Sequence, residues 1–322
     1  MKAVLIRENG DASKLEYAEV DEPVVGARQV LVEVEAAGLN FIDIYHRIGL
    51  YPADLPLVLG LEGAGRVVSV GPGVTDRDVG NRVAWADGSG SYAELITVDA
   101  DHLVTVPEGI GADAAAAVML QGLTAHYLAT DTYPLSAGDT CLVHAGAGGV
   151  GLLLTQLAKN AGAKVVTTVG TAAKAKTSRA AGSDHVVIYS DGDFATEITE
   201  QLGKRPFDVV YDGVGQATFE QSLDLLKPRG LMVTFGNASG PVPEIAPLIL
   251  SRKGSLYLTR PTLRDYIQTK EELRRRAGDL FEWISSGRLK VKIGASLRLW
   301  EAAKAHRMLE GRESSGKIIL QP

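Results

Sequence analysis

The strongest chemical signal in this sequence is a set of three glycines with the spacing G-x-G-x-x-G, namely Gly146, Gly148 and Gly151. They follow an apolar segment, 140–145, and open a helical pattern over 150–161. In this context the first glycine permits a tight turn, the second lets the backbone approach a pyrophosphate, and the third lets helix and strand pack closely. The helix N-terminus adds free N–H groups and a positive dipole end. The pattern therefore predicts a dinucleotide site, against the alternative of a tight turn without a ligand.

The segment that follows favours NADPH over NADH. Enzymes that prefer NAD place an Asp or Glu about 20 residues beyond the glycine loop, where the carboxylate binds the ribose 2′-hydroxyl. Here residues 167–171 read TTVGT, without an acid, and Lys174 follows. The missing carboxylate removes repulsion and the ammonium adds attraction, so that a 2′-phosphate fits. The alternative is that Lys174 is an ordinary solvated lysine, like Lys176.

The elements that position this site fall into two parts, of which the first is rich in strands. Segment 30–36 alternates strictly between apolar and polar residues, as a half-buried strand does. Further short strands are expected at 65–70, 82–86 and 91–98, with Gly- and Pro-rich turns between them. Many short strands at close spacing indicate a compact, barrel-like β domain.

Beyond residue 110 the sequence becomes helical and then alternates between strands and helices. Two helices are expected at 112–117 and 122–130. The strands that follow are expected at 140–145, 164–169, 184–188, 208–212, 231–235 and 255–258. The helices between them are expected at 150–161, 171–181, 194–202 and 217–226. This alternation is typical of a doubly wound parallel sheet.

The tail, after about residue 264, interrupts the alternation. It contains a long amphipathic helix, a short strand at 289–293, a second helix and a last strand at 317–320. These late strands do not extend the alternation cleanly, which leaves them free to pack back on the first domain.

The bulk composition excludes several classes of protein. A length of 322 residues exceeds the size at which one core usually stops growing, so two domains are expected. The formal net charge of −6 argues against a nucleic-acid surface or an anionic membrane as the main partner. The single cysteine, Cys141, allows no intramolecular disulfide, and a core position is expected for it. No secretory signal opens the sequence and no apolar stretch reaches the ~20 residues of a membrane span, so a cytoplasmic enzyme is the default expectation.

Several motifs, taken together, resemble the zinc-independent quinone oxidoreductase branch (zeta-crystallin-like) of the medium-chain dehydrogenase/reductases. Besides the glycine loop they are Gly38–Asp43 (GLNFID), Tyr45, Gly49–Tyr51, Gly60–Gly65 (GLEGAG), Gly80–Val83, Val169–Thr171, Tyr211–Gly215 (YDGVG), Phe235–Asn237 and Thr259–Pro261. The resemblance covers essentially the whole chain. It implies an α/β protein with a GroES-like β-barrel catalytic domain at 1–123, completed by 265–322, and a Rossmann cofactor domain at 124–264. It also implies a homodimer, with the edge strand 255–258 as the contact.

The sequence departs from the zinc alcohol dehydrogenases of the same superfamily at their metal-binding positions. Those relatives carry a cysteine where Asn40 stands and a histidine where Leu61 stands. Their structural zinc lobe needs four cysteines, and this chain has one. Zinc requires a tight shell of Cys, His or carboxylate ligands. We therefore predict no bound metal and no metal Lewis-acid catalysis.

The resemblance places the segment from Asn40 to Tyr51 beside the nicotinamide, which makes Asn40, Tyr45 and Tyr51 the candidate catalytic residues. Asn40 would orient the carboxamide, the ribose or the acceptor oxygen, while the two tyrosines would line the pocket and donate hydroxyl protons. The alternative for Asn40 is that it caps a helix starting at Phe41, as asparagine often does. The alternative for Tyr45 is simple packing.

The cofactor contacts implied by the resemblance are spread along the chain. They are Phe41, Asp43, Tyr127, Gly146, Gly148, Gly149, Val150, Gly151, Gly170, Thr171, Lys174, Tyr189, Val214, Phe235, Gly236, Asn237, Ala238, Thr262, Leu263 and Arg312. Among them, Tyr189 and Arg312 would join Lys174 around the 2′-phosphate. The alternative for Arg312 is a surface arginine on the last helix.

Two classes of function remain open at this point. The first is an NADPH-dependent reductase, acting on a quinone or on the activated C=C bond of an enone, alkenal or enoyl thioester, because the fold and the cofactor loop serve both. The second is a cofactor-binding structural or RNA-binding protein, as some zeta-crystallin-like proteins are; the net charge of −6 disfavours RNA.

Overall fold

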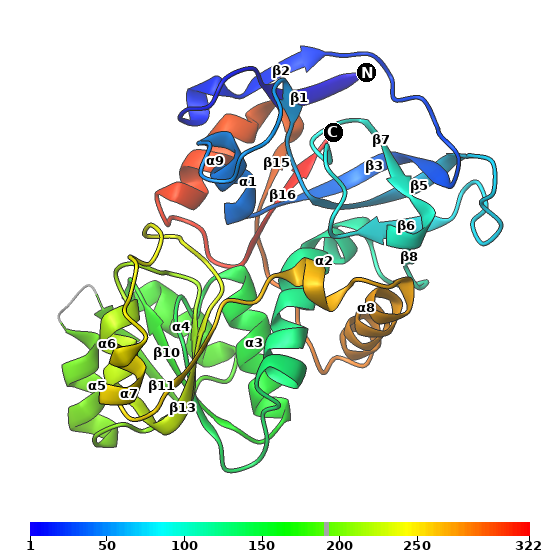
Figure 1. Cartoon of the computed structure of the whole chain (residues 1–322). Coiled ribbons are helices and arrows are strands. Elements are labelled where there is room, and N and C mark those ends of the chain that lie inside the picture. Colours follow the sequence, from blue (N-terminus) through cyan, green and yellow to red (C-terminus); the bar gives the residue numbers. More distant parts are fainter. Residues whose placement is uncertain (190–192) are drawn as a thin grey trace. The chain divides into compact units, whose positions relative to one another are not determined.

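The computed structural model describes residues 1–189 and 193–322. The chain divides into one unit formed by Met1–Leu123 with Tyr266–Pro322 and a second unit formed by Thr124–Asp265. The first unit is therefore discontinuous in sequence, and its last segment is red to orange in Figure 1.

A seven-stranded sheet forms the centre of the first unit. The strand order is β15-β16-β3-β5-β6-β8, and β7 pairs with β3. The strands are β3 (Gln29–Leu39), β5 (Glu62–Val70), β6 (Arg82–Trp85), β7 (Leu95–Asp99), β8 (Val104–Thr105), β15 (Ile293–Arg298) and β16 (Lys317–Gln321). A smaller sheet has the order β2-β1-β4, with β1 (Lys2–Ile6), β2 (Glu16–Glu19) and β4 (Leu57–Val58). The two late strands thus join the sheet of the first part of the chain.

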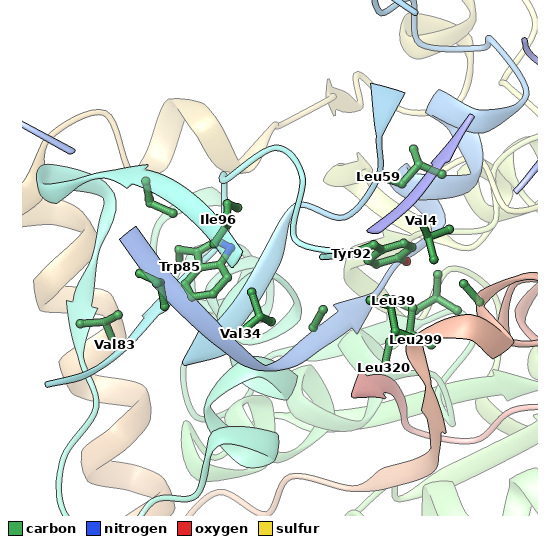
Figure 2. Packing of buried hydrophobic residues seen from close by; sticks show 14 of the residues in the cluster. Val4, Val34, Leu39, Leu59, Val83, Trp85, Tyr92, Ile96, Leu299 and Leu320 are labelled. Carbon is green, nitrogen blue, oxygen red and sulfur yellow. The ribbon is translucent and has the colours of Figure 1, made fainter. Parts of the chain in front are cut away.

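Alternation along β3 turns one row of side chains into the core. Val30, Val32 and Val34 are all buried there, as the alternating pattern predicted. Figure 2 shows Val34 of β3 in the same cluster as Trp85 and Tyr92. Two aromatic rings therefore fill the interior of this unit, and Tyr92 brings a hydroxyl group into it.

Two of the strands expected in the first unit were wrong. Residues 91–98 do not form one strand: β7 begins at Leu95, because Tyr92 O instead accepts from Val4 N at 2.8 Å. The strand expected at 289–293 is β15, which begins only at Ile293.

The helices of this unit cover the sheets and their ends. They are η1 (Ala12–Lys14), α1 (Phe41–Arg47), η2 (Ala100–His102), α2 (Ala112–Tyr127), α8 (Lys270–Ser285), η6 (Leu299–Glu301) and α9 (Ala302–Glu310). Where two helices were expected around Gly122, α2 is continuous and runs on into the second unit. A Cβ on Gly122 would lie 3.1 Å from Leu280 Cδ1, so the glycine serves helix packing rather than a break.

The second unit is a six-stranded parallel sheet with the order β11-β10-β9-β12-β13-β14, flanked by helices (Figure 1). The strands are β9 (Thr140–Val143), β10 (Lys164–Val169), β11 (His185–Ile188), β12 (Phe207–Asp212), β13 (Leu226–Thr234) and β14 (Tyr257–Thr259). The helices are η3 (Leu128–Thr132), α3 (Gly149–Asn160), α4 (Ala172–Ala180), α5 (Phe194–Leu202), α6 (Phe219–Asp224), α7 (Leu248–Arg252) and η5 (Leu263–Tyr266). The predicted doubly wound parallel sheet is confirmed. β13 begins five residues before the expected 231, so the expected helix 217–226 is shortened to α6.

Among the described residues, no helix is both long enough and apolar enough to span a bilayer.

Candidate functional site

The glycine-rich segment forms the turn between β9 and α3, at the carboxyl edge of the parallel sheet. Gly148 occupies the N-cap position of α3 with extended backbone, and Gly148 N donates to Ala145 O at 2.8 Å. Leu152 N donates back to Gly148 O at 2.9 Å. The N–H groups of Gly149, Val150 and Gly151 in the first helical turn therefore have no acceptor within the helix. Such a turn presents several donors and a positive dipole end to an anion.

Each of the three glycines is needed for a different reason. A Cβ on Gly146 would lie 2.4 Å from Thr167 Cβ, and one on Gly151 would lie 2.4 Å from Ala145 O. Those two glycines therefore let the turn, β10 and α3 pack closely. A Cβ on Gly148 would meet only Ala145 O, at 3.2 Å, so the outer side of this residue is open. The positive φ of the turn, 53°, falls on Ala145, so Gly146 is needed for its lack of a side chain and not for a left-handed backbone.

A buried histidine, His144, lies directly before the glycine-rich turn and supports it through hydrogen bonds. Sequence reasoning gave this residue no role at the site. His144 Nδ1 lies 2.7 Å from Thr168 Oγ1, and its Nε2 lies 2.8 Å from Ser222 Oγ. Burial lowers the pKa of His144, so the neutral ring bridges two hydroxyl groups. The residue links β9, β10 and α6, and it is a structural support rather than a proton donor.

The residues predicted to surround a 2′-phosphate gather at the end of β10. Thr171 occupies the N-cap of α4, where its side chain accepts from Lys174 N at 3.2 Å. A Cβ on Gly170 would lie 3.2 Å from Tyr189 Oη, so the tyrosine ring packs directly against this glycine. The structure thus brings Gly170, Thr171, Lys174 and Tyr189 together. Arg312 lies in the first unit, after α9, with a φ of 57°.

The loops that follow β12 and β13 lie at the same carboxyl edge of the parallel sheet as the glycine-rich turn. Asp212 organises them: its buried carboxylate accepts from Val214 N at 2.7 Å, Gly215 N at 3.1 Å and Thr218 Oγ1 at 2.8 Å. A Cβ on Gly236 would lie 2.4 Å from Gly213 O, so the two loops touch through glycine backbone. Asp212 stands in a motif noted in the sequence, but nothing in the pattern revealed that it holds the loop.

Other predicted cofactor residues lie elsewhere in the second unit. Phe235, Asn237 and Ala238 follow β13, and Ala238 N donates to Gly213 O at 3.3 Å. Thr262 and Leu263 follow β14, where Arg260 Nη1 donates to Thr234 O at 3.1 Å. Tyr127 is buried at the end of α2.

The candidate catalytic residues lie in and around α1 of the first unit. The rings of Tyr45 and Tyr51 meet edge to face with centroids 5.2 Å apart, and Phe41 lies 6.2 Å from Tyr45. Tyr45 is buried, while Tyr51 is half-exposed. The structure therefore brings both tyrosines into one aromatic group with Phe41.

Asn40 stands at the N-cap of α1, as expected, in a capping box with Asp43. Its backbone N–H donates to Asp43 Oδ2 at 2.8 Å, while its amide turns into a buried polar cluster. Asn40 Nδ2 donates to Glu62 Oε1 at 2.6 Å, and Asn40 Oδ1 accepts from Lys317 Nζ at 2.8 Å and from Gln121 Nε2 at 3.1 Å. Lys317 also forms a short ion pair with Glu62.

This cluster contains ionisable groups with perturbed pKa values. Burial raises the pKa of Asp43 from 3.8 to about 7, against the opposing effect of its hydrogen bonds from Asn40 N–H and the Tyr92 hydroxyl. Burial also lowers the pKa of Lys317, and Glu62 opposes that change. Sequence reasoning assigned no role to Glu62, Lys317, Gln121 or Tyr92. The one sequence feature that pointed to this cluster was Lys317, a charged residue at the start of an otherwise apolar strand.

The donor set does not fit a divalent metal. The Lys317 ammonium already occupies the oxygen ligands that Asn40 and Glu62 would offer, and it repels a second cation. Within residues 1–189 and 193–322, no three His, Cys, Asp or Glu side chains gather with metal-binding geometry. Cys141 is buried in β9, and burial raises the pKa of its thiol to about 12.

Comparison with known proteins agrees with this geometry. Residues 26–108 match the family model described as alcohol dehydrogenase GroES-like domain, and residues 149–283 match the one described as zinc-binding dehydrogenase. A quinone oxidoreductase of Pseudomonas aeruginosa is 47% identical over 97% of this chain and 97% of its own. The structure of Escherichia coli quinone oxidoreductase complexed with NADPH aligns with a TM-score of 0.97 at 42% identity, covering 100% of both chains. A 2-haloacrylate reductase of a Burkholderia species is 38% identical over 99% of this chain and 98% of its own.

Proposed function

Because the chain belongs to the quinone oxidoreductase branch of the medium-chain dehydrogenase/reductase superfamily, we propose that it is an NADPH-dependent quinone oxidoreductase. The observation that carries the proposal is the turn from β9 to α3, with free N–H groups and an open face at Gly148. The unit 124–265 is then the cofactor-binding domain, and residues 1–123 with 266–322 form the catalytic domain.

The residues of the turn fit the pyrophosphate of a dinucleotide. The N–H groups of Gly149, Val150 and Gly151 supply hydrogen bonds, and Gly148 leaves room for close approach. At the end of β10, Lys174 supplies a positive charge and Tyr189 a hydroxyl group, with no carboxylate in residues 167–171. This combination favours a 2′-phosphate, and so NADPH rather than NADH.

The reaction requires little acid catalysis from the protein. NADPH, when bound, supplies a hydride. A quinone accepts the hydride and one proton to become a hydroquinone, and it delocalises the developing negative charge itself. The protein has therefore to position the acceptor and to donate hydrogen bonds to its oxygen. We assign the hydrogen bonds to Tyr45 and Tyr51, and the positioning to Asn40, whose amide is itself held in the buried polar cluster, without a metal.

A second candidate is reduction of an activated C=C bond. The observation that favours it is the 38% identity to a 2-haloacrylate reductase, whose named substrate class is an activated alkene. Both reactions use the same cofactor site and differ in the acceptor.

The experiment is a spectrophotometric screen of NADPH oxidation across quinones, enones and enoyl thioesters, with NADH run in parallel. We expect the highest kcat/KM with NADPH and a quinone. Turnover only with enones or enoyl thioesters would show that the second candidate, reduction of an activated C=C bond, is the function. Binding of NADPH without turnover of any acceptor would contradict both.

We also propose that the protein is a homodimer that pairs through β14. This strand is at the edge of the six-stranded sheet, and Tyr257 on it is 62% exposed. An exposed edge strand offers unpaired backbone groups to a second copy. Light scattering should give twice the chain mass, and Tyr257→Glu should shift it towards the monomer. A monomeric parent protein would contradict the proposal.

A further inference from the structure

The buried ion pair between Glu62 and Lys317 has a defined origin in the sheet register. Gly38 in β3 pairs with Glu62 in β5, and Leu39 pairs with Ile318 in β16. Both charged side chains therefore converge over β3, one from each neighbouring strand. Glu62 is fully buried and Lys317 is 1% exposed.

A missing side chain in β3 makes room for this pair. A Cβ on Gly38 would lie 2.3 Å from Glu62 Oε1 and 2.7 Å from Lys317 Cε. The φ of Gly38 is not in the left-handed region, so the backbone conformation does not require a glycine there. The glycine is required because a Cβ would clash with the two charged side chains. The second oxygen of Glu62 accepts from Leu120 N at 2.5 Å, which ties the pair to α2.

The pair determines which way the Asn40 amide faces. The carbonyl oxygen meets two donors, Lys317 and Gln121, while the NH₂ group meets the carboxylate of Glu62. A flipped amide would direct its NH₂ group at an ammonium and its oxygen at a carboxylate. Both contacts would then be repulsive, so only one orientation is compatible with the charges.

Asn40 in turn fixes the start of α1. Its backbone N–H donates to Asp43, and Asp43 accepts from the Tyr92 hydroxyl at 3.0 Å. Tyr45 follows one half-turn later on the same short helix. A change in Asn40 is therefore transmitted to the residues that line the proposed acceptor pocket.

We propose that Lys317 is a positioning residue for the reaction: its ammonium, held by Glu62 over Gly38, fixes the amide of Asn40 and thereby the N-terminal turn of α1. It acts through Asn40 and does not contact the acceptor. The inference rests on the proposed function, because it assigns the acceptor to α1. A purely structural ion pair is the competing explanation, and it predicts a different outcome for one double variant.

The test compares Lys317→Met, Glu62→Gln and the double variant Glu62→Gln/Lys317→Met with the parent. Lys304→Met is the matched control, because Lys304 forms an ion pair with Glu301 at the surface. Each protein is measured for unfolding by urea, for NADPH affinity by fluorescence, and for kcat and KM with NADPH and 1,4-benzoquinone. Lys317→Met leaves a buried carboxylate unpaired and should lose both stability and kcat.

The double variant separates the two explanations. It contains no buried charge at this place, so its urea midpoint should return close to that of the parent. Its NADPH affinity should stay within about twofold, while kcat with 1,4-benzoquinone should remain about fivefold to tenfold low, within the limit of about tenfold that a quinone sets on the loss of a hydrogen-bond donor. A double variant with parental stability and parental kcat would show that the pair serves packing alone, and would overturn the proposal.

Two further measurements keep the inference testable. If the double variant does not fold, the comparison of Glu62→Gln with Lys317→Met decides. Glu62→Gln retains the ammonium that donates to Asn40 Oδ1, and the amide oxygen that it introduces can still accept from Lys317 and Asn40. A loss of kcat as large as in Lys317→Met would therefore overturn the assignment to Lys317. NMR of the parent should show slow solvent exchange of the Asn40 side-chain NH₂, and rapid exchange would also overturn it. This measurement needs no turnover, whereas failure of the proposed function would appear as a parent protein that does not oxidise NADPH with any quinone.

Discussion

The hydroxyl of Tyr92 donates to Asp43 Oδ2 at 3.0 Å, inside the core of the first unit. Asp43 is 1% exposed, and its other oxygen, Oδ1, has no hydrogen-bond partner within residues 1–189 and 193–322. An unpaired buried oxygen makes the ionised carboxylate costly, which is the physical reason why burial raises the pKa of Asp43 to about 7.

We predict that Asp43 makes the protein less stable as pH rises from about 4 to about 7. In that window the folded protein holds a proton on Asp43 that the unfolded chain has released, because the folded pKa is the higher of the two. The free energy of unfolding should therefore fall by about 1.4 kcal/mol per pH unit from this group.

The measurement is the difference in the free energy of unfolding by urea between the parent and Asp43→Asn, taken at about four pH values from about 4.5 to about 8. His144 and His306, whose pKa values are lowered by burial, oppose the trend in each protein but cancel in the difference. A difference that does not change with pH would show that Asp43 titrates outside this range.

Gly146→Ala and Gly148→Ala should separate folding from cofactor binding. The first substitution places a methyl group against Thr167 and should cost about 1–3 kcal/mol of stability by overpacking. The second meets only Ala145 O and should leave the fold intact. It should weaken NADPH binding about tenfold or more, the scale of one lost hydrogen bond to a charged group. Urea unfolding and NADPH titration of both variants test this, and loss of stability without loss of affinity in Gly148→Ala would be the contrary result.

Lys174→Ala should reduce the preference for NADPH. Loss of one charged contact to the 2′-phosphate should weaken NADPH binding by about 10–150-fold and leave NADH binding unchanged. Dissociation constants for both cofactors, in parent and variant, provide the measurement, and Lys176→Ala is the control two residues away. Equal affinity of the parent for NADPH and NADH would count against the 2′-phosphate site.

Tyr45→Phe and Tyr51→Phe should affect an enone more than a quinone. A quinone delocalises its developing charge, so loss of a hydroxyl donor should lower kcat/KM by about tenfold or less; for an enone the loss should be larger, up to about 10²–10³-fold. NADPH affinity should change little, because the hydroxyl addresses the acceptor. If neither substitution changes kcat/KM for either acceptor, both tyrosines are packing residues.

How far the sequence could predict this molecule depends on whether an interaction is local. The turn at Gly146 and the helix expected at 171–181 depend on neighbouring residues, so both could be placed from the sequence. The strand expected at 164–169 matches β10 for the same reason. The break expected in the helix at Gly122 was wrong, because this glycine packs against Leu280 on a helix distant in sequence.

The polar cluster around Asn40 could not be predicted, because its members come from four separate elements. Glu62, Gln121 and Lys317 meet Asn40 only after three strands and a helix have assembled. Nothing in the residue types near Asn40 indicates that an ammonium 277 positions away binds its side chain. The pairing of β16 with β3 is the missing information.

The late arrival of β16 also sets an order on biosynthesis. Lys317 follows Glu62 by 255 positions, and the whole unit 124–265 is synthesised between them. A nascent chain that leaves the ribosome N-terminus first holds Glu62 long before its counter-ion exists, and a lone carboxylate resists burial. We therefore expect the sheet around β3 to be completed only after the inserted unit 124–265 has been synthesised. On this expectation, the ion pair between Glu62 and Lys317 forms among the last contacts of the first unit.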